Sequence, residues 1–126
     1  MYNNIFGEMK FNSGWESDRS IEFLKKTYTV TIHATAYYES DRITRQQEEA
    51  YVYFLTYEES ILEHVVDILR SGDFKQEPLK RYVPCSINFQ RDGSFAVLLD
   101  DTHDIEGGLA VSILPSLKIL SVDEFL

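Results

Sequence analysis

Tyr28-Thr29-Val30-Thr31-Ile32-His33-Ala34-Thr35-Ala36-Tyr37-Tyr38 is the stretch of sequence that decides the fold. Apolar and polar side chains alternate along it, and a β-strand places alternate side chains on opposite faces. One face would carry Tyr28, Val30, Ile32, Ala34, Ala36 and Tyr38, and the other Thr29, Thr31, His33, Thr35 and Tyr37. The pattern predicts an antiparallel strand whose apolar face lies on the core. The threonine-rich face is open to two interpretations, a ligand surface or a dimer interface.

Further strands are predicted on both sides of this stretch. We expect them at residues 4–11 and 20–24, and then at 82–89, 94–99, 109–114 and 117–121. Turn-forming residues separate them at Asn12-Ser13-Gly14, Lys25-Lys26, Arg91-Asp92-Gly93 and Pro115-Ser116. Asp-Gly predicts a hairpin because glycine adopts a positive φ without steric cost.

Two helices are predicted between residues 44 and 71. Thr44 and Gln47 fit a capping box, in which the threonine side chain accepts from a backbone N–H and the glutamine side chain reaches back. Thr56 and Glu59 repeat this spacing, so the second helix is expected to begin there, and Gly72 is placed to end it. The apolar stripes are Ala50, Tyr51, Phe54 and Leu55, followed by Ile61, Leu62, Val65, Ile68 and Leu69. One bent helix over the whole segment is the alternative.

The predicted element order is βββ-αα-ββββ, with connections of hairpin length. This order is typical of an α+β fold, in which a mainly antiparallel sheet of about six or seven strands carries the helix pair on one face. The length of 126 residues suits a single domain, 1–126, with a core that needs no disulfide or structural metal.

The charge distribution limits the possible partners. The net charge is −9, from 12 basic and 21 acidic residues, and the basic residues cluster only in the short segment 75–81. Because nucleic-acid binding depends on cationic contacts to phosphate, nucleic acid is not expected as a partner, nor is an anionic membrane. A basic protein, a cation or simple solubility remain as explanations of the acidity. The single cysteine, Cys85, and the absence of an apolar leader favour the cytoplasm, and no motif requires a cofactor.

The chain also resembles a known family in several short motifs. These are Phe6-Gly7, Gly14-Trp15, Tyr37-Tyr38, Ile43-Thr44-Arg45-Gln46-Gln47-Glu48-Glu49-Ala50-Tyr51, Asp92-Gly93-Ser94-Phe95, Asp104-Ile105-Glu106-Gly107-Gly108-Leu109-Ala110-Val111 and Asp123-Glu124-Phe125-Leu126. They are similar to a small, uncharacterised bacterial family of domains of unknown function. The resemblance implies a cytoplasmic α+β protein and assigns no catalytic residue. A histidine expected before the glycine in relatives is replaced here by Gly107.

Asp100-Asp101-Thr102-His103-Asp104-Ile105-Glu106 concentrates four carboxylates and a histidine in seven residues. Carboxylate oxygens suit calcium or magnesium, so Asp100, Asp104 and Glu106 are candidate metal ligands. The favoured interpretation is a turn in which Asp104 and Glu106 accept backbone N–H groups. The third interpretation of this segment is contact with a partner through Asp101 and His103.

Glu59, Glu63 and Asp67 lie at successive i, i+4 positions of the second predicted helix. Like charges at this spacing disfavour a helix, so the stripe needs a reason. It would face either the basic connector of the same molecule or a basic partner.

His33, His64 and His103 are treated as unrelated polar residues, since zinc needs three or four converging ligands. Cys85 is treated as structural, because no helix N-terminus or histidine is placed to activate it.

Two hypotheses of different class follow. The first is a non-enzymatic binding domain that presents acidic surfaces to a protein partner, and an immunity protein that neutralises a toxin would be one example. The alternative is a small metal-dependent hydrolase that holds a cation with Asp100, Asp104 and Glu106. The sequence does not fix the oligomeric state.

Overall fold

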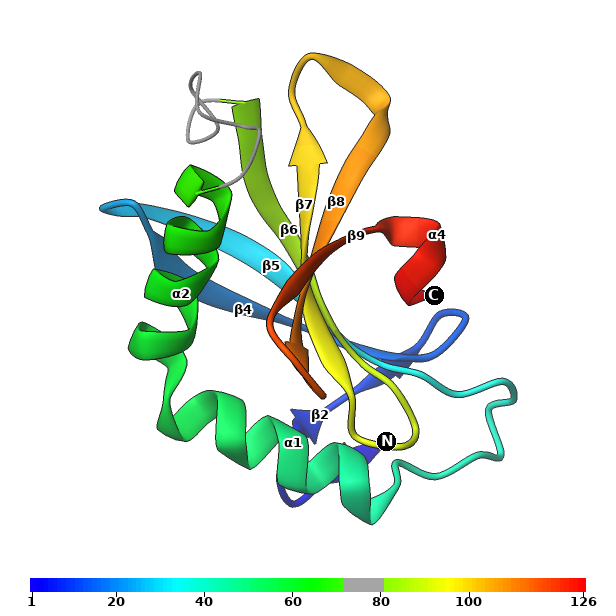
Figure 1. Ribbon diagram of the computed structural model, residues 1–126. Helices are drawn as coiled ribbons and strands as arrows, with labels where there is room; N and C mark the ends of the chain where they lie inside the picture. Colours follow the sequence, from blue (N-terminus) through cyan, green and yellow to red (C-terminus); the bar gives the residue numbers. More distant parts are fainter. Residues whose placement is uncertain (72–80) are drawn as a thin grey trace.

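The computed structural model describes residues 1–71 and 81–126. In this part of the chain a seven-stranded sheet runs in the order β3-β4-β5-β6-β7-β8-β9, and β1 pairs with β2 in a small second sheet (Figure 1). The strands are β1 (Tyr2–Asn3), β2 (Gly7–Glu8), β3 (Lys10–Phe11), β4 (Trp15–Phe23), β5 (Lys26–Ala34), β6 (Tyr82–Phe89), β7 (Phe95–Asp101), β8 (Asp104–Leu114) and β9 (Lys118–Ser121). The helices are α1 (Arg45–Thr56), α2 (Glu58–Ser71) and α4 (Val122–Phe125).

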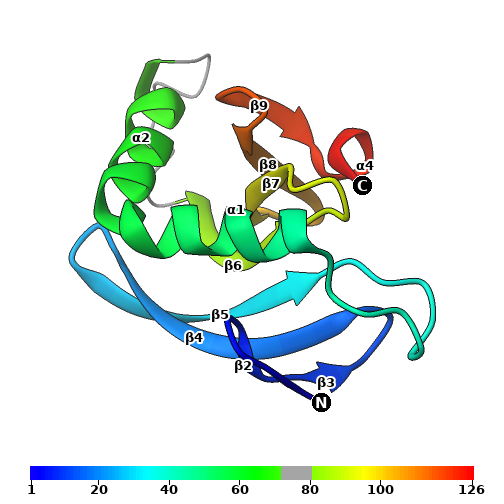
Figure 2. The ribbon, with the colours of Figure 1, turned by 90° about the horizontal axis from the view of Figure 1, so that it is seen from below.

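The predicted α+β class is confirmed, and the sheet is mostly antiparallel. The one exception among the described strand pairs is β5 with β6, which run parallel. The chain passes from β5 to β6 through α1 and α2, as a parallel pair requires a long crossover. Both helices lie on the same face of the sheet, and the sheet curves around them (Figure 2).

The strand predicted from Tyr28 to Tyr38 ends earlier than expected. β5 ends at Ala34, while Thr35 to Tyr38 lead into a loop. The loop is fixed by Asp41, whose Oδ2 accepts from the backbone N–H groups of Tyr37 and Tyr38 at 3.0 and 3.1 Å. Alternation was therefore a correct guide to the faces of Tyr28 to Ala36, but Tyr38 is exposed instead of lying on the core.

The N-terminal strand prediction was wrong in detail. Residues 4–11 hold two short strands, β2 and β3, because Asn3 Oδ1 accepts from the N–H groups of Ile5 and Phe6 and turns the chain. β4 begins at Trp15 and β8 at Asp104, so both extend further than their predicted ranges.

The first helix begins as predicted, while the second does not. Thr44 Oγ1 accepts from the backbone N–H of Gln47, and Gln47 Oε1 accepts from that of Thr44, which confirms the capping box. Thr56 caps nothing and instead donates from Oγ1 to the carbonyl of Val52. α2 starts after the single residue Tyr57, and Leu55 is exposed rather than part of the buried stripe. Gly72 lies outside the described residues.

The main core lies between the helices and the sheet. It joins Phe54, Val65 and Leu69 of the helices to the inward residues of the strands, among them Ile32 and Phe89. Phe54, Phe89 and Phe95 make ring contacts with one another at its centre. In the described residues, no helix combines the length and the apolar character needed to cross a membrane.

A smaller apolar cluster lies on the opposite face. Ala96, Leu98 and Ala110 are buried there, and the partly buried side chains of Val122 and Phe125 from α4 pack against them. The face that α1 and α2 leave open is thus only partly covered. The strands β4, β5 and β6 present their polar side chains on the remainder.

Candidate functional site

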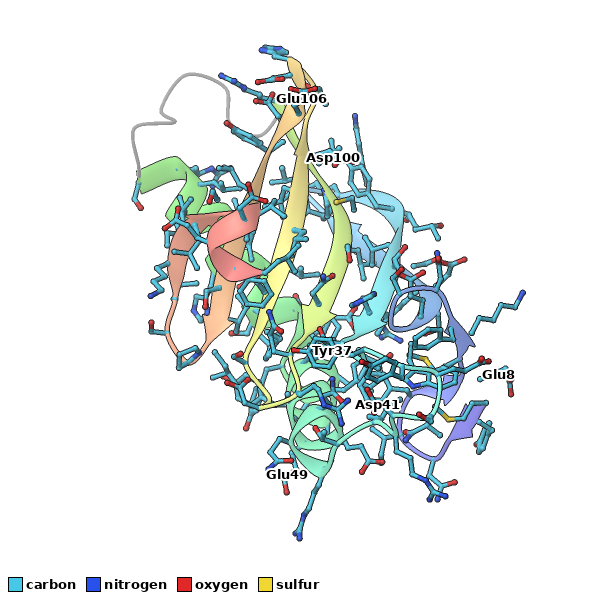
Figure 3. The ribbon with its side chains drawn as sticks, turned by 90° about the vertical axis from the view of Figure 1, so that its right-hand side faces the viewer. Glu8, Tyr37, Asp41, Glu49, Asp100 and Glu106 are labelled. Atoms are coloured by element: carbon cyan, nitrogen blue, oxygen red, sulfur yellow. The ribbon has the colours of Figure 1, made fainter. Side chains whose placement is uncertain are left out.

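The acidic segment is the tip of the β7–β8 hairpin. Asp100 and Asp101 end β7, Asp104 begins β8, and the hairpin projects away from the helices (Figure 1). Figure 3 shows Asp100 and Glu106 at the end of the molecule opposite to Glu49. The segment is therefore part of two paired strands rather than a free loop.

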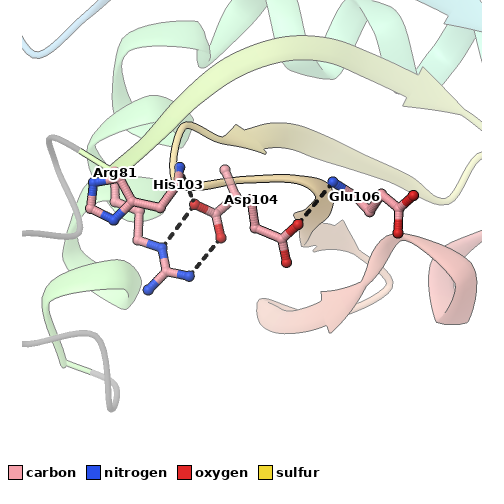
Figure 4. A network of polar contacts seen from close by, with 5 residues as sticks. Arg81, His103, Asp104 and Glu106 are labelled. Carbon is pink, nitrogen blue, oxygen red and sulfur yellow. Dashed lines mark hydrogen bonds and ion pairs between the residues drawn. The ribbon is translucent and has the colours of Figure 1, made fainter.

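Asp101 holds this tip together through its bonds to Arg81 and His103, the two residues labelled at the left of Figure 4. Its carboxylate accepts from Nε of Arg81 at 2.8 Å and from a terminal nitrogen of the same guanidinium at 2.7 Å. It also accepts from the backbone N–H of His103 at 2.9 Å. These bonds, those to Arg81 above all, lower the pKa of Asp101 to about 2. Asp101 is buried and has this structural role, whereas His103 is exposed, and the partner contact expected of both residues stays a prediction.

The favoured turn interpretation holds for Asp104 and not for Glu106. Asp104 Oδ1 accepts from the backbone N–H of Glu106 at 3.1 Å, so Glu106 contributes its N–H rather than its carboxylate to the turn. Within residues 1–71 and 81–126, no three His, Cys, Asp or Glu side chains are placed together to hold a metal ion. The geometry thus gives no support to a cation held by Asp100, Asp104 and Glu106.

The three histidines lie on different elements. His64 is exposed on α2 and His103 is exposed at the hairpin tip. His33 lies on the open face of β5, where its Nδ1 is 2.9 Å from Oε2 of Glu16 on β4. This contact was not expected from the sequence, because it depends on the β4–β5 register that sets Glu16 opposite His33.

Cys85 has the environment of a structural thiol. Its Sγ donates to the carbonyl of Leu98, and the residue packs against the smaller apolar cluster. Burial, together with the nearby carboxylate of Asp100, raises the pKa of the thiol to about 12. A thiol in this state is a poor nucleophile at neutral pH.

The predicted acidic stripe lines a groove. Glu59, Glu63 and Asp67 are exposed along α2, and they face the β4–β5 hairpin across a groove of about 580 Å³. Two more carboxylates, Glu22 and Glu58, and two cations, Lys25 and Arg70, complete its polar lining. Its apolar lining consists of Phe23, Leu24, Leu62 and Val66.

One groove carboxylate is already neutralised. Oε1 of Glu58 accepts from Nε and a terminal nitrogen of Arg19 at 3.0 and 2.6 Å. In the described part of the chain, no ion pair involves Glu22, Glu59, Glu63 or Asp67. Among the described residues, the groove therefore keeps four unpaired carboxylates beside partly exposed apolar side chains. The alternative in which the stripe faces the basic connector concerns residues 72–80, outside the described residues.

Sequence reasoning missed part of this groove. Glu22 comes from a different element, β4, and lines the groove next to the tight turn at Leu24 and Lys25, both with positive φ. Its alternation with the other exposed residues of β4, Asp18 and Ser20, gives no signal by itself, since any exposed strand face is polar. Glu58 was not recognised as a groove residue because the second helix was predicted to begin at Thr56, whereas α2 begins at Glu58.

Comparisons with protein-family models, with curated proteins and with solved structures give no match for this chain.

Proposed function

We propose that this protein is a non-enzymatic binding domain and that the groove between α2 and the β4–β5 hairpin receives a basic segment of a protein partner. The observation that carries the proposal is the combination, among the described residues, of four unpaired carboxylates with an apolar floor in one groove. An immunity protein that neutralises a basic toxin is one instance of this class. The proposal includes the bacterial cytoplasm as the location, in keeping with the family resemblance and the lone Cys85.

The chemistry of the groove matches a peptide with lysine or arginine and apolar side chains. Leu24 and Val66 are only half-buried, so a partner would remove further apolar surface from water. The carboxylates would attract a cationic segment and favour its correct orientation. A second electrostatic observation agrees: the i, i+4 spacing of Glu59, Glu63 and Asp67 disfavours the isolated helix, and a bound cation would relieve that repulsion.

The test compares two variants that lose the same charge. The groove variant is E59Q/E63Q/D67N, and the control variant is D18N/E39Q/E106Q, whose exposed carboxylates lie outside the groove. Each protein is used to capture partners from the organism that produces it, at low and high salt. We expect a basic protein to bind the wild type and the control variant, and to be lost with the groove variant or at high salt.

Hydrogen exchange of the purified complex then locates the contact. Protection is expected in residues 22–25 and 58–70. The proposal is wrong if every captured protein binds the groove variant as well as the wild type. It is also wrong if the two variants lose the partner equally, because net charge alone would then explain binding.

A further inference from the structure

A second hollow lies on the open face of the sheet, away from α1 and α2. The parallel register of β5 and β6 sets Thr31 beside Ser86 and His33 beside Asn88, and the antiparallel register of β4 sets Glu16 opposite His33. These side chains share one face, because Val30 and Ile32, which alternate with them, point into the main core. The hollow has a volume of about 580 Å³, within the range of about 300–1,000 Å³ typical of ligand pockets.

Asn88 is a buried polar residue whose bonding capacity is only partly used. It is 7% exposed, and its Oδ1 accepts from the hydroxyl of Ser86. Its NH₂ group donates to no atom of the described residues. Among these residues, no side-chain nitrogen or oxygen that is sealed from solvent lacks a hydrogen-bond partner, so the NH₂ group is not sealed. The NH₂ group therefore opens on the hollow that Asn88 lines. A buried amide is normally fully hydrogen-bonded, so this donor points to a ligand.

The charge of the hollow does not favour an anionic ligand. Among the described residues, no lysine or arginine lines it, so a phosphate or carboxylate would find no counter-ion. Its one side-chain carboxylate in the described part of the chain, that of Glu16, is engaged by His33. The other polar lining groups include hydroxyls and amides, of Thr31, Thr35, Ser86 and Gln90. Such groups suit a neutral ligand that both donates and accepts hydrogen bonds.

An aromatic ring stands at the rim of the hollow. Tyr37 lines it and is 74% exposed, and the bond from its backbone N–H to Asp41 fixes the loop that carries it. Figure 3 shows Tyr37 and Asp41 on the same loop. The apolar face of a sugar ring packs well on such a side chain, whose body is apolar and whose tip is polar.

We propose that this hollow binds a neutral polyhydroxylated ligand of the saccharide class. The hydroxyls of the ligand accept from the NH₂ of Asn88 and exchange hydrogen bonds with Thr31, while Tyr37 covers one face of the ring. Gly14 lies against His33: a Cβ added there would be 2.5 Å from Nε2 of the imidazole, so the glycine leaves the ring its place on the sheet. The site is one of binding, without a chemical step.

Nuclear magnetic resonance with a defined panel tests the proposal. The neutral probes are glucose, galactose, mannose, N-acetylglucosamine and sucrose, and the anionic probes are inorganic phosphate and acetate. We expect at least one saccharide, and neither anion, to shift the side-chain NH₂ resonances of Asn88 in a saturable manner. The proposal is wrong if no saccharide shifts them, or if an anion does so in place of the saccharides.

Two pairs of matched variants locate the contact. Tyr37→Ala is expected to weaken saccharide binding about fivefold, whereas Tyr38→Ala, at a neighbour 71% exposed and outside the hollow, leaves it unchanged. Thr31→Val is expected to weaken binding, and Thr29→Val, on the same face of β5 but outside the hollow, is not. Equal effects within either pair would overturn the assignment of the ligand to this hollow.

Discussion

Asp101 is a buried carboxylate whose charge is held by Arg81 and by the backbone N–H of His103. Its pKa is about 2 in the folded protein, below the value of about 3.9 expected in the unfolded chain. A lowered pKa stabilises the fold above the unfolded value, and this contribution is lost as the pH falls toward 2.

We therefore expect Asp101→Asn to lower the urea midpoint at pH 7, and the difference from the wild type to shrink as the pH falls from about 4 to 2. The shrinkage follows because a protonated Asp101 resembles asparagine in charge. Urea unfolding of both proteins across this pH range is the measurement. A difference that stays constant down to pH 2 would show that the Arg81 contact is not ionic in its effect.

Single residues also mark where sequence reasoning stops. The cluster from Asp100 to Glu106 is obvious in the sequence, but its members differ in burial: Asp101 is buried and Glu106 is exposed. Which carboxylate turns inward depends on Arg81, 20 residues earlier. Asn88 was missed for a similar reason, because an asparagine in a strand becomes informative only when its burial and its partners are known.

At the scale of elements, regular patterns predicted types and faces better than ends. The alternation in β5 identified the buried Val30, Ile32 and Ala34, and the capping box identified Thr44 as the N-cap of α1. The end of β5 depends on Asp41, which captures two backbone N–H groups of the following loop. The sequence around β5 and β6 gave no sign of their parallel pairing, since this pairing depends on where α1 and α2 bring the chain back to the sheet.

The acidic stripe of α2 gives a prediction at this scale. Glu63 has like charges four residues away on both sides, Glu59 and Asp67. We expect Glu63→Gln to raise the free energy of unfolding by about 0.5 kcal/mol, because each such pair costs about 0.2–0.5 kcal/mol. Urea unfolding at low salt measures the change. Glu106→Gln is the control, since it removes one charge from the hairpin tip instead; a gain in the control equal to that of Glu63→Gln would contradict the local explanation.

A gain in stability on removing Glu63 would also bear on function. A residue that destabilises its own helix and lines a groove is expected to serve binding, because active surfaces often conflict with stability. The stripe is therefore the point at which the requirements of the fold and of the proposed partner differ.

For the whole molecule, composition and element order were sufficient to predict the α+β class, but not the division of its surface. The sheet has one face covered by α1 and α2, and another shared between a small apolar cluster under α4 and the polar hollow beside His33. The four residues of α4 had no recognisable apolar pattern in the sequence. Without α4, the location of the open polar surface could not be predicted.

The net charge of −9 predicts how the whole molecule responds to salt. Excess charge of one sign destabilises the compact state through self-repulsion. Salt shortens the screening length from about 30 Å at 0.01 M to about 3 Å at 1 M, so the repulsion between distant carboxylates weakens. The partly buried pairs Arg19–Glu58 and Arg81–Asp101 are screened less.

We expect the melting temperature to rise with sodium chloride over this range, and to rise less steeply in the variant D18N/E39Q/E106Q, which carries three fewer negative charges. A melting temperature that falls with salt would show that the ion pairs outweigh the repulsion.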